Sequence, residues 1–138
     1  MKLYASLIVC ILLLSSFQNV NKMKSIEKET ITFPATDGLT ITADLYEVSN
    51  PKSTILLCHQ AGFSRGEYMN SVKRLNKMGY SCLAIDQRSG ETVNGVKNET
   101  AALANEKGLG TTYLDAKRDV ESAIKFLFNK NKWLSEIY

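Results

Sequence analysis

The chain has 138 residues, a length suited to one domain rather than two. With 44% hydrophobic residues, 22% charged residues and two prolines, its composition is that of a globular protein and excludes a disordered one. The net charge is only +3, and the lysines are scattered without interleaved aromatic residues, so we expect no nucleic-acid partner.

The amino terminus is typical of a signal peptide. A lysine precedes an apolar run at residues 3–14, and the polar Ser15, Ser16 and Gln18 follow it. Because the run is shorter than the ~20 residues that cross a bilayer, we expect no stable membrane span. We predict export to the periplasm or the medium; a membrane tether through this run is the alternative, since no small-x-small cleavage site is clear. The expected layout is a signal peptide at residues 1–18, a linker at 19–28 and one domain at 29–138.

Two antiparallel strands are predicted to open the domain. Residues 29–33 and 39–48 alternate between polar and apolar side chains, which is typical of half-buried strands. Asp37 and Gly38 between them form a turn signal that favours antiparallel pairing. The apolar face of the second strand carries Ile41, Ala43 and Leu45.

A βαβ unit is predicted to follow. Residues 53–58 and 80–85 are largely apolar without alternation, as expected for strands that are covered on both faces. Between them, apolar residues recur at helical spacing and Gly79 supplies a stop. The predicted helical stripe is Tyr68, Met69, Val72, Leu75 and Met78. The order strand, helix, strand indicates two parallel strands of one sheet.

The two cysteines of this unit, Cys58 and Cys82, are not expected to form a disulfide. One lies at the end of a predicted parallel strand and the other near the start of the next. An offset of ~4 residues would separate them by about 13 Å, which is too far for a bridge. We interpret both as small buried apolar residues.

A long connection and a second helix complete the chain. The 24 residues 87–110 are rich in Gly, Asn, Glu and Thr, with only a weak helical signal at 101–105. A connection of this length is typically functional or mobile, and we expect it to overhang a pocket as a lid. A helix is predicted at residues 113–130, with a buried stripe of Ala116, Val120, Ala123, Ile124 and Leu127.

Polar side chains follow both strands of the βαβ unit, at the sheet edge where ligands gather. His59 and Ser64 come after the first strand, and Asp86 and Arg88 come after the second. We interpret His59 as structural. We interpret Asp86 and Arg88 as an internal pair that shapes the turn, with the binding of an acidic substrate as the alternative.

This order of elements and motifs resembles the amino-terminal half of an α/β-hydrolase, of the dienelactone-hydrolase-like, exported esterase or peptidase type. The first motif is H-Q-A-G, starting at His59, and the second is D-Q-R-S-G, starting at Asp86. Family members often have His-Gly-x and Asp-x-Arg-Gly-x-Gly at these points, so Gln60 replaces a glycine and the second motif is close but not identical. The resemblance covers roughly residues 30–130 and implies a three-layer αβα fold.

The resemblance also implies a role for the first turn. In the family this turn contributes a backbone N–H to the oxyanion hole, which corresponds to Ala61 here, with Gln60 as the neighbouring option. The residues Gly62-Phe63-Ser64-Arg65-Gly66 match the G-x-S-x-G nucleophile elbow, but we interpret Ser64 as a helix cap in a capping box with Glu67. In the family the elbow follows the fifth strand and a histidine comes later; here no histidine follows Ser64.

We therefore expect the amino-terminal part of an α/β-hydrolase domain, truncated before the nucleophile elbow. The complete form would cleave an ester, amide or similar acyl bond of a small molecule or peptide through a serine or cysteine, and this chain alone would be inactive. The alternative is a non-catalytic α/β binding module or degenerate hydrolase scaffold; a flavodoxin-like domain is disfavoured by the opening antiparallel pair. No cofactor is expected, and no metal, because one histidine and two distant cysteines cannot supply three or four ligands.

Two further expectations concern what is missing from such a half-domain. The nucleotide sequence beyond the codon for Tyr138 should encode an apolar strand followed by G-x-S-x-G or G-x-C-x-G within about 15 residues, and a histidine much later. The strand at residues 55–57 would be left as an apolar edge, which is a template for aggregation. We expect the isolated chain to be poorly soluble, oligomeric or molten.

Overall fold

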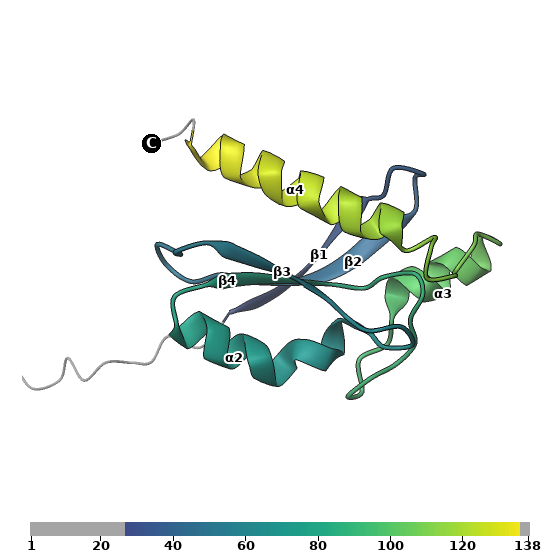
Figure 1. Cartoon of the computed structure of the whole chain (residues 1–138), viewed down its shortest axis with the longest axis horizontal. Helices are drawn as coiled ribbons and strands as arrows, with labels where there is room; N and C mark the ends of the chain where they lie inside the picture. Colours follow the sequence, from purple (N-terminus) through teal and green to yellow (C-terminus); the bar gives the residue numbers. More distant parts are fainter. Residues whose placement is uncertain (1–26, 136–138) are drawn as a thin grey trace, which may run out of the picture.

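A computed structural model describes residues 27–135, which form one four-stranded mixed sheet with helices on both faces. The strands are β1 (Lys28–Pro34), β2 (Thr40–Tyr46), β3 (Thr54–Cys58) and β4 (Ser81–Ile85), in the spatial order β1-β2-β4-β3. In Figure 1, α4 (Lys117–Ser135) lies on one face of the sheet and α2 (Met69–Lys77) on the other. The predicted signal peptide lies outside the described residues, as does the linker except for its last two positions, and β1 already begins at Lys28.

The strand pairings confirm the predicted topology. β1 and β2 are antiparallel, with Ile31 opposite Ala43. Their turn is closed by an Ala35 N–H to Leu39 O bond of 2.7 Å, and Gly38 has a φ of +82°, which a glycine adopts without strain. β3 and β4 are parallel, while β2 runs antiparallel to β4. The sequence thus specifies both the hairpin and the βαβ unit.

The pairing of β3 with β4 also accounts for the two cysteines. Cys82 lies opposite Ile55, three residues before Cys58 in the strand, rather than the expected four. Both cysteines are free, as predicted. Cys82 is buried, as predicted, whereas Cys58 is only half-buried. Burial raises the pKa of both thiols.

Two cores lie on the two faces of the sheet. The larger core fills the space between the sheet and α4, where the ring of Phe126 stacks on Phe33 with ring centroids 4.6 Å apart. Its fully buried members include Leu39, Ile41, Ala43, Leu83, Ile85, Ala104 and Ala123. The smaller core lies under α2 and consists of Tyr46, Val72, Cys82 and Ala84 with partly buried neighbours. Strands with apolar residues on both faces are what this three-layer arrangement requires.

The helix between β3 and β4 begins as the 3₁₀ turn η2 (Arg65–Tyr68) and continues as α2. Val72 is buried and Gly79 ends the helix with a φ of +89°, as predicted. Met69 and Met78 were expected in the buried stripe but are exposed. They stand at the two ends of α2, at the junction with the tighter 3₁₀ turn and at the carboxyl cap, where the helical phase no longer points them at the sheet.

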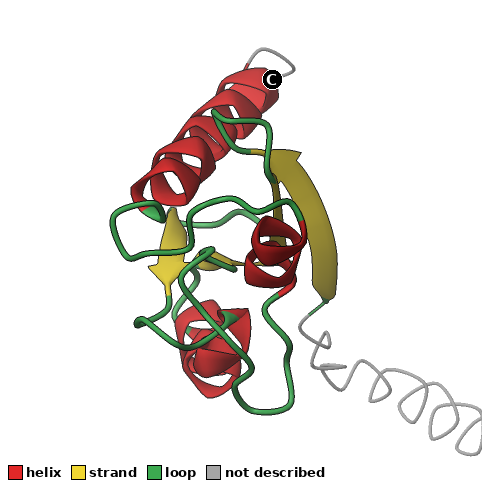
Figure 2. Cartoon of the chain, turned by 90° about the vertical axis from the view of Figure 1, so that its right-hand side faces the viewer, coloured by secondary structure: helices red, strands yellow, loops and turns green. Residues whose placement is uncertain are grey.

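The segment 87–110 is not the open lid that the sequence predicts. It contains α3 (Glu99–Glu106), whose Asn98 cap accepts a hydrogen bond from Ala101 N–H. Thr100, Ala101 and Ala104 are buried, so the segment packs onto the domain instead of overhanging it. Figure 2 shows α3 beside the carboxyl ends of the strands.

α4 differs from its prediction at its start and on one flank. It begins at Lys117 because Thr112 and Asp115 form a hydrogen-bonded turn just before it. The predicted stripe is buried or partly buried except for Ile124, which is 56% exposed. No strand or helix of the described residues covers Ile124 enough to bury it. No helix within residues 27–135 is long and apolar enough to cross a membrane.

Removing the ring of Phe126 tests whether its stack on Phe33 holds α4 on the sheet. We expect Phe126→Ala to lower the free energy of unfolding by about 2–3 kcal/mol, measured by urea denaturation. Asn129→Ala, on an exposed position of the same helix, is the control and should change it by less than about 0.5 kcal/mol. Equal losses in both variants would contradict the assignment.

Candidate functional site

The turn after β3 begins with a histidine whose two ring nitrogens are both engaged. His59 is 4% exposed; its Nδ1 lies 2.8 Å from Gln60 O, and its Nε2 lies 2.8 Å from Gln87 N. Because Gln87 N–H can only donate, Nε2 accepts and the proton sits on Nδ1, where it is donated to the carbonyl. His59 thus joins the turns after β3 and β4, in keeping with the structural role predicted for it.

The next two residues differ in their backbone N–H groups. The N–H of Gln60 donates to Glu67 Oε2 at 3.0 Å and is therefore occupied. No hydrogen-bond acceptor meets the N–H of Ala61 among the described residues, and Ala61 is exposed. Of the two positions predicted for an oxyanion donor, only Ala61 has a donor free to meet a ligand.

Ala61 occupies a defined position in a tight turn. The N–H of Phe63 donates to Gln60 O at 3.1 Å, and Gly62 has a φ of +84°. This places Ala61 and Gly62 at the two central positions of a type II turn, where the second needs a positive φ and the first accepts even proline. The direction of the Ala61 N–H is therefore set by the backbone before any ligand arrives.

The turn is also held from outside by the chain that follows β4. The N–H of Gly62 donates to Ser89 O at 3.0 Å, and Asn98 Nδ2 donates to Phe63 O at 3.0 Å and to Gln87 O at 2.8 Å. Gly90 allows this approach, because a Cβ there would stand 1.9 Å from Phe63 O. The two turns form one rigid edge, which Figure 2 shows from the side of the carboxyl ends of the strands.

Ser64 is a cap, as predicted, and is not placed to act as a nucleophile. Its side chain is fully buried, accepts from Gly66 N–H at 3.2 Å and donates to Val96 O at 2.7 Å. The predicted capping box is wrong in one respect, since the Glu67 carboxylate binds Gln60 N–H rather than the N–H of Ser64. The G-x-S-x-G match is thus explained by the start of a helix.

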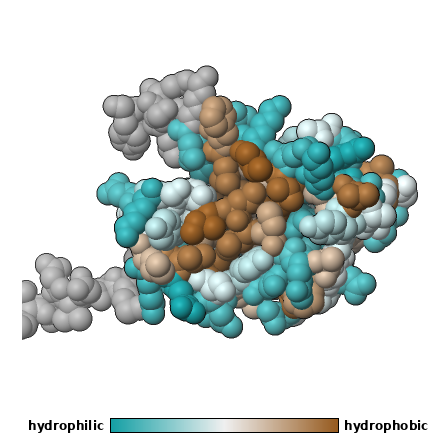
Figure 3. Space-filling view, in the orientation of Figure 1, coloured by the Kyte–Doolittle hydropathy of each residue, from teal (hydrophilic) through white to brown (hydrophobic). Residues whose placement is uncertain are grey.

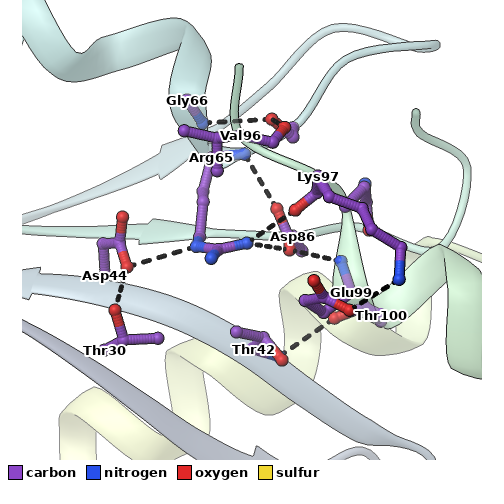
Figure 4. A network of polar contacts seen from close by, with 12 residues as sticks. Thr30, Thr42, Asp44, Arg65, Gly66, Asp86, Val96, Lys97, Glu99 and Thr100 are labelled. Carbon is purple, nitrogen blue, oxygen red and sulfur yellow. Dashed lines mark hydrogen bonds and ion pairs between the residues drawn. The ribbon is translucent and has the colours of Figure 1, made fainter. Parts of the chain in front are cut away.

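The predicted pair of Asp86 and Arg88 does not form, because each binds a different partner. Asp86 accepts from the guanidinium and the backbone N–H of Arg65, and from Glu99 N–H. The other side of the same guanidinium lies 3.1 Å from Asp44 Oδ1. Figure 4 shows Arg65 between the two carboxylates.

Burial and charge oppose each other in this buried group. Burial raises the pKa of Asp86, and its contacts with Arg65 and Glu99 N–H work against that rise. Burial alone would lower the pKa of Arg65, but Asp86 and Asp44 raise it overall. Arg65 contacts both carboxylates, and Asp44 also binds Lys28 at 3.3 Å, so the group ties the start of η2 to β2 and to the end of β4.

Arg88 has a separate set of partners on the other side of the sheet. It is 2% exposed and binds two carboxylates: that of Asp119 in α4, which is buried, and that of Asp37 in the β1–β2 turn, which is partly exposed. The backbone N–H of Arg88 also donates to Asp119 Oδ2 at 2.8 Å. With its guanidinium fully engaged, Arg88 is a structural link and is not available to bind an acidic substrate.

A hollow of about 300 Å³ lies beside this edge of the sheet. The Oε1 atom of Gln87 is buried without a hydrogen-bond partner, and Gln87 forms part of the wall. The other lining residues are Tyr113, Leu114, Ala116, Lys117 and Val120. Residues 27–135 contain no group of three or more His, Cys, Asp or Glu side chains that could hold a metal ion.

Sequence reasoning missed three residues that build this edge. Asn98 was detectable, because an Asn before Glu-Thr-Ala-Ala is a typical helix cap. Arg65 and Asp119 gave no such signal, because their partners lie 21 and 31 residues away. Only the adjacency of strands and helices in the fold brings these charges together.

Solved structures of lipases and esterases resemble this chain. A thermostable carboxyl esterase from Bacillus coagulans matches it with a TM-score of 0.54 and 14% identity, over 78% of this chain and 34% of its own. An open-form lipase matches with a TM-score of 0.49 and 19% identity, over 72% and 30%. An esterase from Pyrococcus furiosus matches with a TM-score of 0.39 and 25% identity, over 48% and 25%.

These likenesses show the fold. The match to the carboxyl esterase, together with the mixed sheet and its flanking helices, confirms an α/β-hydrolase-like scaffold. The chain spans about a third of the length of the first two structures. No protein-family model matches the sequence. No curated protein matches it either.

The ion pair between Asp37 and Arg88 predicts how stability depends on pH. The hydrogen bond from Arg88 lowers the pKa of Asp37, so its stabilising effect is complete above the unfolded pKa of about 3.9 and is lost as pH falls through the lower folded pKa. We expect Asp37→Asn to lower the free energy of unfolding by about 2 kcal/mol at pH 7 and by less at pH 3. Urea denaturation at the two pH values measures this.

Glu29→Gln is the control for that comparison, because Glu29 is an exposed carboxylate with no ion pair among the described residues. Its effect should be small at both pH values. A loss in Asp37→Asn that is as large at pH 3 as at pH 7 would show that the carboxylate charge is not what stabilises the fold.

Proposed function

We propose that this chain is the amino-terminal portion of an exported α/β-hydrolase that cleaves an ester, amide or similar acyl bond. The observation that carries the proposal is the free, pre-oriented N–H of Ala61 at the carboxyl end of β3, beside an occupied N–H at Gln60. The α/β-hydrolase-like scaffold supplies the context for it. Export is proposed from the signal-peptide pattern of residues 1–18.

The chemistry of acyl transfer explains why a donor of this kind is useful. Attack on the carbonyl produces a tetrahedral intermediate whose oxygen carries negative charge, and fixed donors about 2.7–3.1 Å from that oxygen stabilise it. The Ala61 N–H is held by a type II turn, and that turn is bound by Asn98 and by Ser89 O. Little reorganisation is then needed as the charge develops.

The two candidates in this chain for the nucleophile and the base, Ser64 and His59, are both engaged in other contacts. Ser64 is buried and bonded to Val96 O, and both ring nitrogens of His59 are bonded to backbone groups. We therefore propose that the chain alone is inactive and that a serine or cysteine on another part of the complete protein attacks the substrate. A dienelactone-hydrolase-like enzyme with a small acyl compound or a peptide as substrate is the proposed subtype.

The second candidate is a non-catalytic binding module on the same scaffold. The hollow beside Gln87 supports it, because an unpartnered, buried Oε1 could accept a hydrogen bond from a ligand that lies on Leu114 and Val120. The nucleotide sequence beyond the codon for Tyr138 separates the two candidates. A strand followed by G-x-S-x-G or G-x-C-x-G supports the hydrolase, and the lack of such an elbow in every frame supports the binding module.

The isolated chain should not turn over p-nitrophenyl acetate. We expect the same background rate for the 138-residue chain and for Ser64→Ala, because the serine is a buried cap. The release of p-nitrophenolate at 405 nm is the measurement, with far-UV circular dichroism to show that both proteins are folded. Turnover that disappears in a folded Ser64→Ala variant would make Ser64 the nucleophile and our interpretation wrong.

The Ala61 donor can be removed without disturbing the turn. Proline suits the first central position of a type II turn but has no N–H, so Ala61→Pro should leave the free energy of unfolding of this chain within about 1 kcal/mol of the original. In the complete polypeptide that carries a nucleophile elbow, the same change should lower kcat by about 10²–10³-fold. Gln60→Ala keeps both backbone donors and is the control; an unchanged kcat in Ala61→Pro would exclude the oxyanion role.

A further inference from the structure

The free N–H of Ala61 belongs to the same peptide group as the carbonyl of Gln60. That carbonyl accepts two hydrogen bonds, one from Phe63 N–H at 3.1 Å and one from His59 Nδ1 at 2.8 Å. The first bond closes the type II turn, and the second comes from the side chain of the residue just before the turn. One end of this peptide group is therefore fixed twice, while its N–H end is open to a ligand.

The contacts of the other ring nitrogen decide where the proton of the imidazole lies. Nε2 of His59 faces two donors, Gln87 N–H at 2.8 Å and Asn98 Nδ2 at 3.2 Å. Asn98 presents its Nδ2 to the ring because its Oδ1 accepts from Ala101 N–H at 2.8 Å. With two donors on Nε2, the proton of the neutral ring lies on Nδ1 and points at Gln60 O.

The surroundings of the ring keep it in this orientation. His59 is 4% exposed, and a Cβ on Gly90 would stand 2.7 Å from its Cε1, so the ring is closely packed on that side. Turning the ring over would put carbon atoms in the places of both nitrogens. The buried N–H of Gln87 would then lack its acceptor, which is unfavourable for a buried donor.

We propose that His59 is a positioning residue for the oxyanion donor of Ala61, an inference that rests on the function proposed above. Through Nδ1–H the ring fixes the direction of the Gln60–Ala61 peptide group, because the C=O and N–H of a planar trans peptide point in opposite directions. The same bond polarises the peptide group and makes the Ala61 N–H a stronger donor. His59 acts through that peptide group and not as a base.

The two ring nitrogens give His59 two separable roles. Nε2 joins the turns after β3 and β4 by accepting from Gln87 N–H, whereas Nδ1 holds the peptide group that carries the Ala61 N–H. The shorter amide of asparagine places a donor where Nδ1 lies, and the longer amide of glutamine places an acceptor where Nε2 lies. His59→Asn therefore keeps the positioning bond and loses the joint between the turns, and His59→Gln does the reverse.

NMR spectra of the 138-residue chain test the bond directly, because His59 is its only histidine. At pH 8, where an ordinary histidine is neutral, long-range ¹H–¹⁵N spectra of the untagged chain should show a proton on Nδ1 and none on Nε2. The residual dipolar coupling of the Ala61 N–H reports its direction. We expect His59→Gln to change this coupling and His59→Asn to preserve it.

Gln60→Ala is the control for these spectra, because it keeps every backbone group of the turn and should preserve the coupling. Far-UV circular dichroism shows that the variants are folded. A proton on Nε2 in the unchanged chain would overturn the proposal without any variant. Equal effects of His59→Asn and His59→Gln on the Ala61 coupling would overturn it as well, since His59 would then be a structural residue only.

Activity separates this proposal from the function on which it rests. In the complete polypeptide that carries a nucleophile elbow, we expect His59→Gln to lower kcat on the order of tenfold with KM unchanged, because the donor is misdirected rather than removed. His59→Asn should retain most of kcat. An unchanged kcat in Ala61→Pro would overturn the oxyanion role and this proposal with it. A lower kcat in Ala61→Pro, with equal kcat in the two His59 variants, would overturn the role of His59 alone.

Discussion

The buried guanidinium of Arg65 makes the contacts on which the two turns at the carboxyl edge of the sheet depend. It lies between Asp44 of β2 and Asp86 at the end of β4, and its own backbone N–H binds Asp86 as well. Asp44 has Lys28 as a second cation, but Asp86 has no other ion pair among the described residues, and breaking a buried pair of this kind typically costs about 3–5 kcal/mol. Since Arg65 opens η2, the same contact fixes where the helix starts and where the turn before it must run.

From that fixed point the geometry of the turn follows. With the start of η2 held, Glu67 reaches back to Gln60 N–H, and the type II turn at Ala61 and Gly62 closes between them. The chain after β4 packs against this turn. Asn98 holds it there by hydrogen bonds to Phe63 O and Gln87 O, and Gly90 allows the close approach because it has no side chain. The outcome is one occupied and one free backbone donor at the carboxyl edge of the sheet, and the free N–H of Ala61 is the one proposed as an oxyanion donor.

The two edge strands of the sheet, β1 and β3, differ in charge and in how well they are covered. β1 is protected by charges and a proline, while β3 is apolar and uncovered along its outer side, with Ile124 and Phe128 exposed next to it. Figure 3 shows a continuous hydrophobic band between α4 and α2. Among the described residues no strand covers this side of β3, which is the feature that the sequence predicts to be a template for aggregation.

The sequence by itself determined the elements whose causes are local. The Asp37-Gly38 turn, the stop at Gly79 and the Ser64 cap depend on backbone preferences of a few adjacent residues, and the apolar runs of β3 and β4 indicate strands with two covered faces. Tertiary structure alone decided which charges meet. Asp86 binds Arg65 and not the nearby Arg88, which binds Asp119 instead. It also decided that Ile124 is exposed and that the N–H of Ala61, not that of Gln60, is free. The physical reason is range: turns, caps and periodicity act over a few residues, whereas ion pairs and burial depend on which strands and helices the fold makes neighbours.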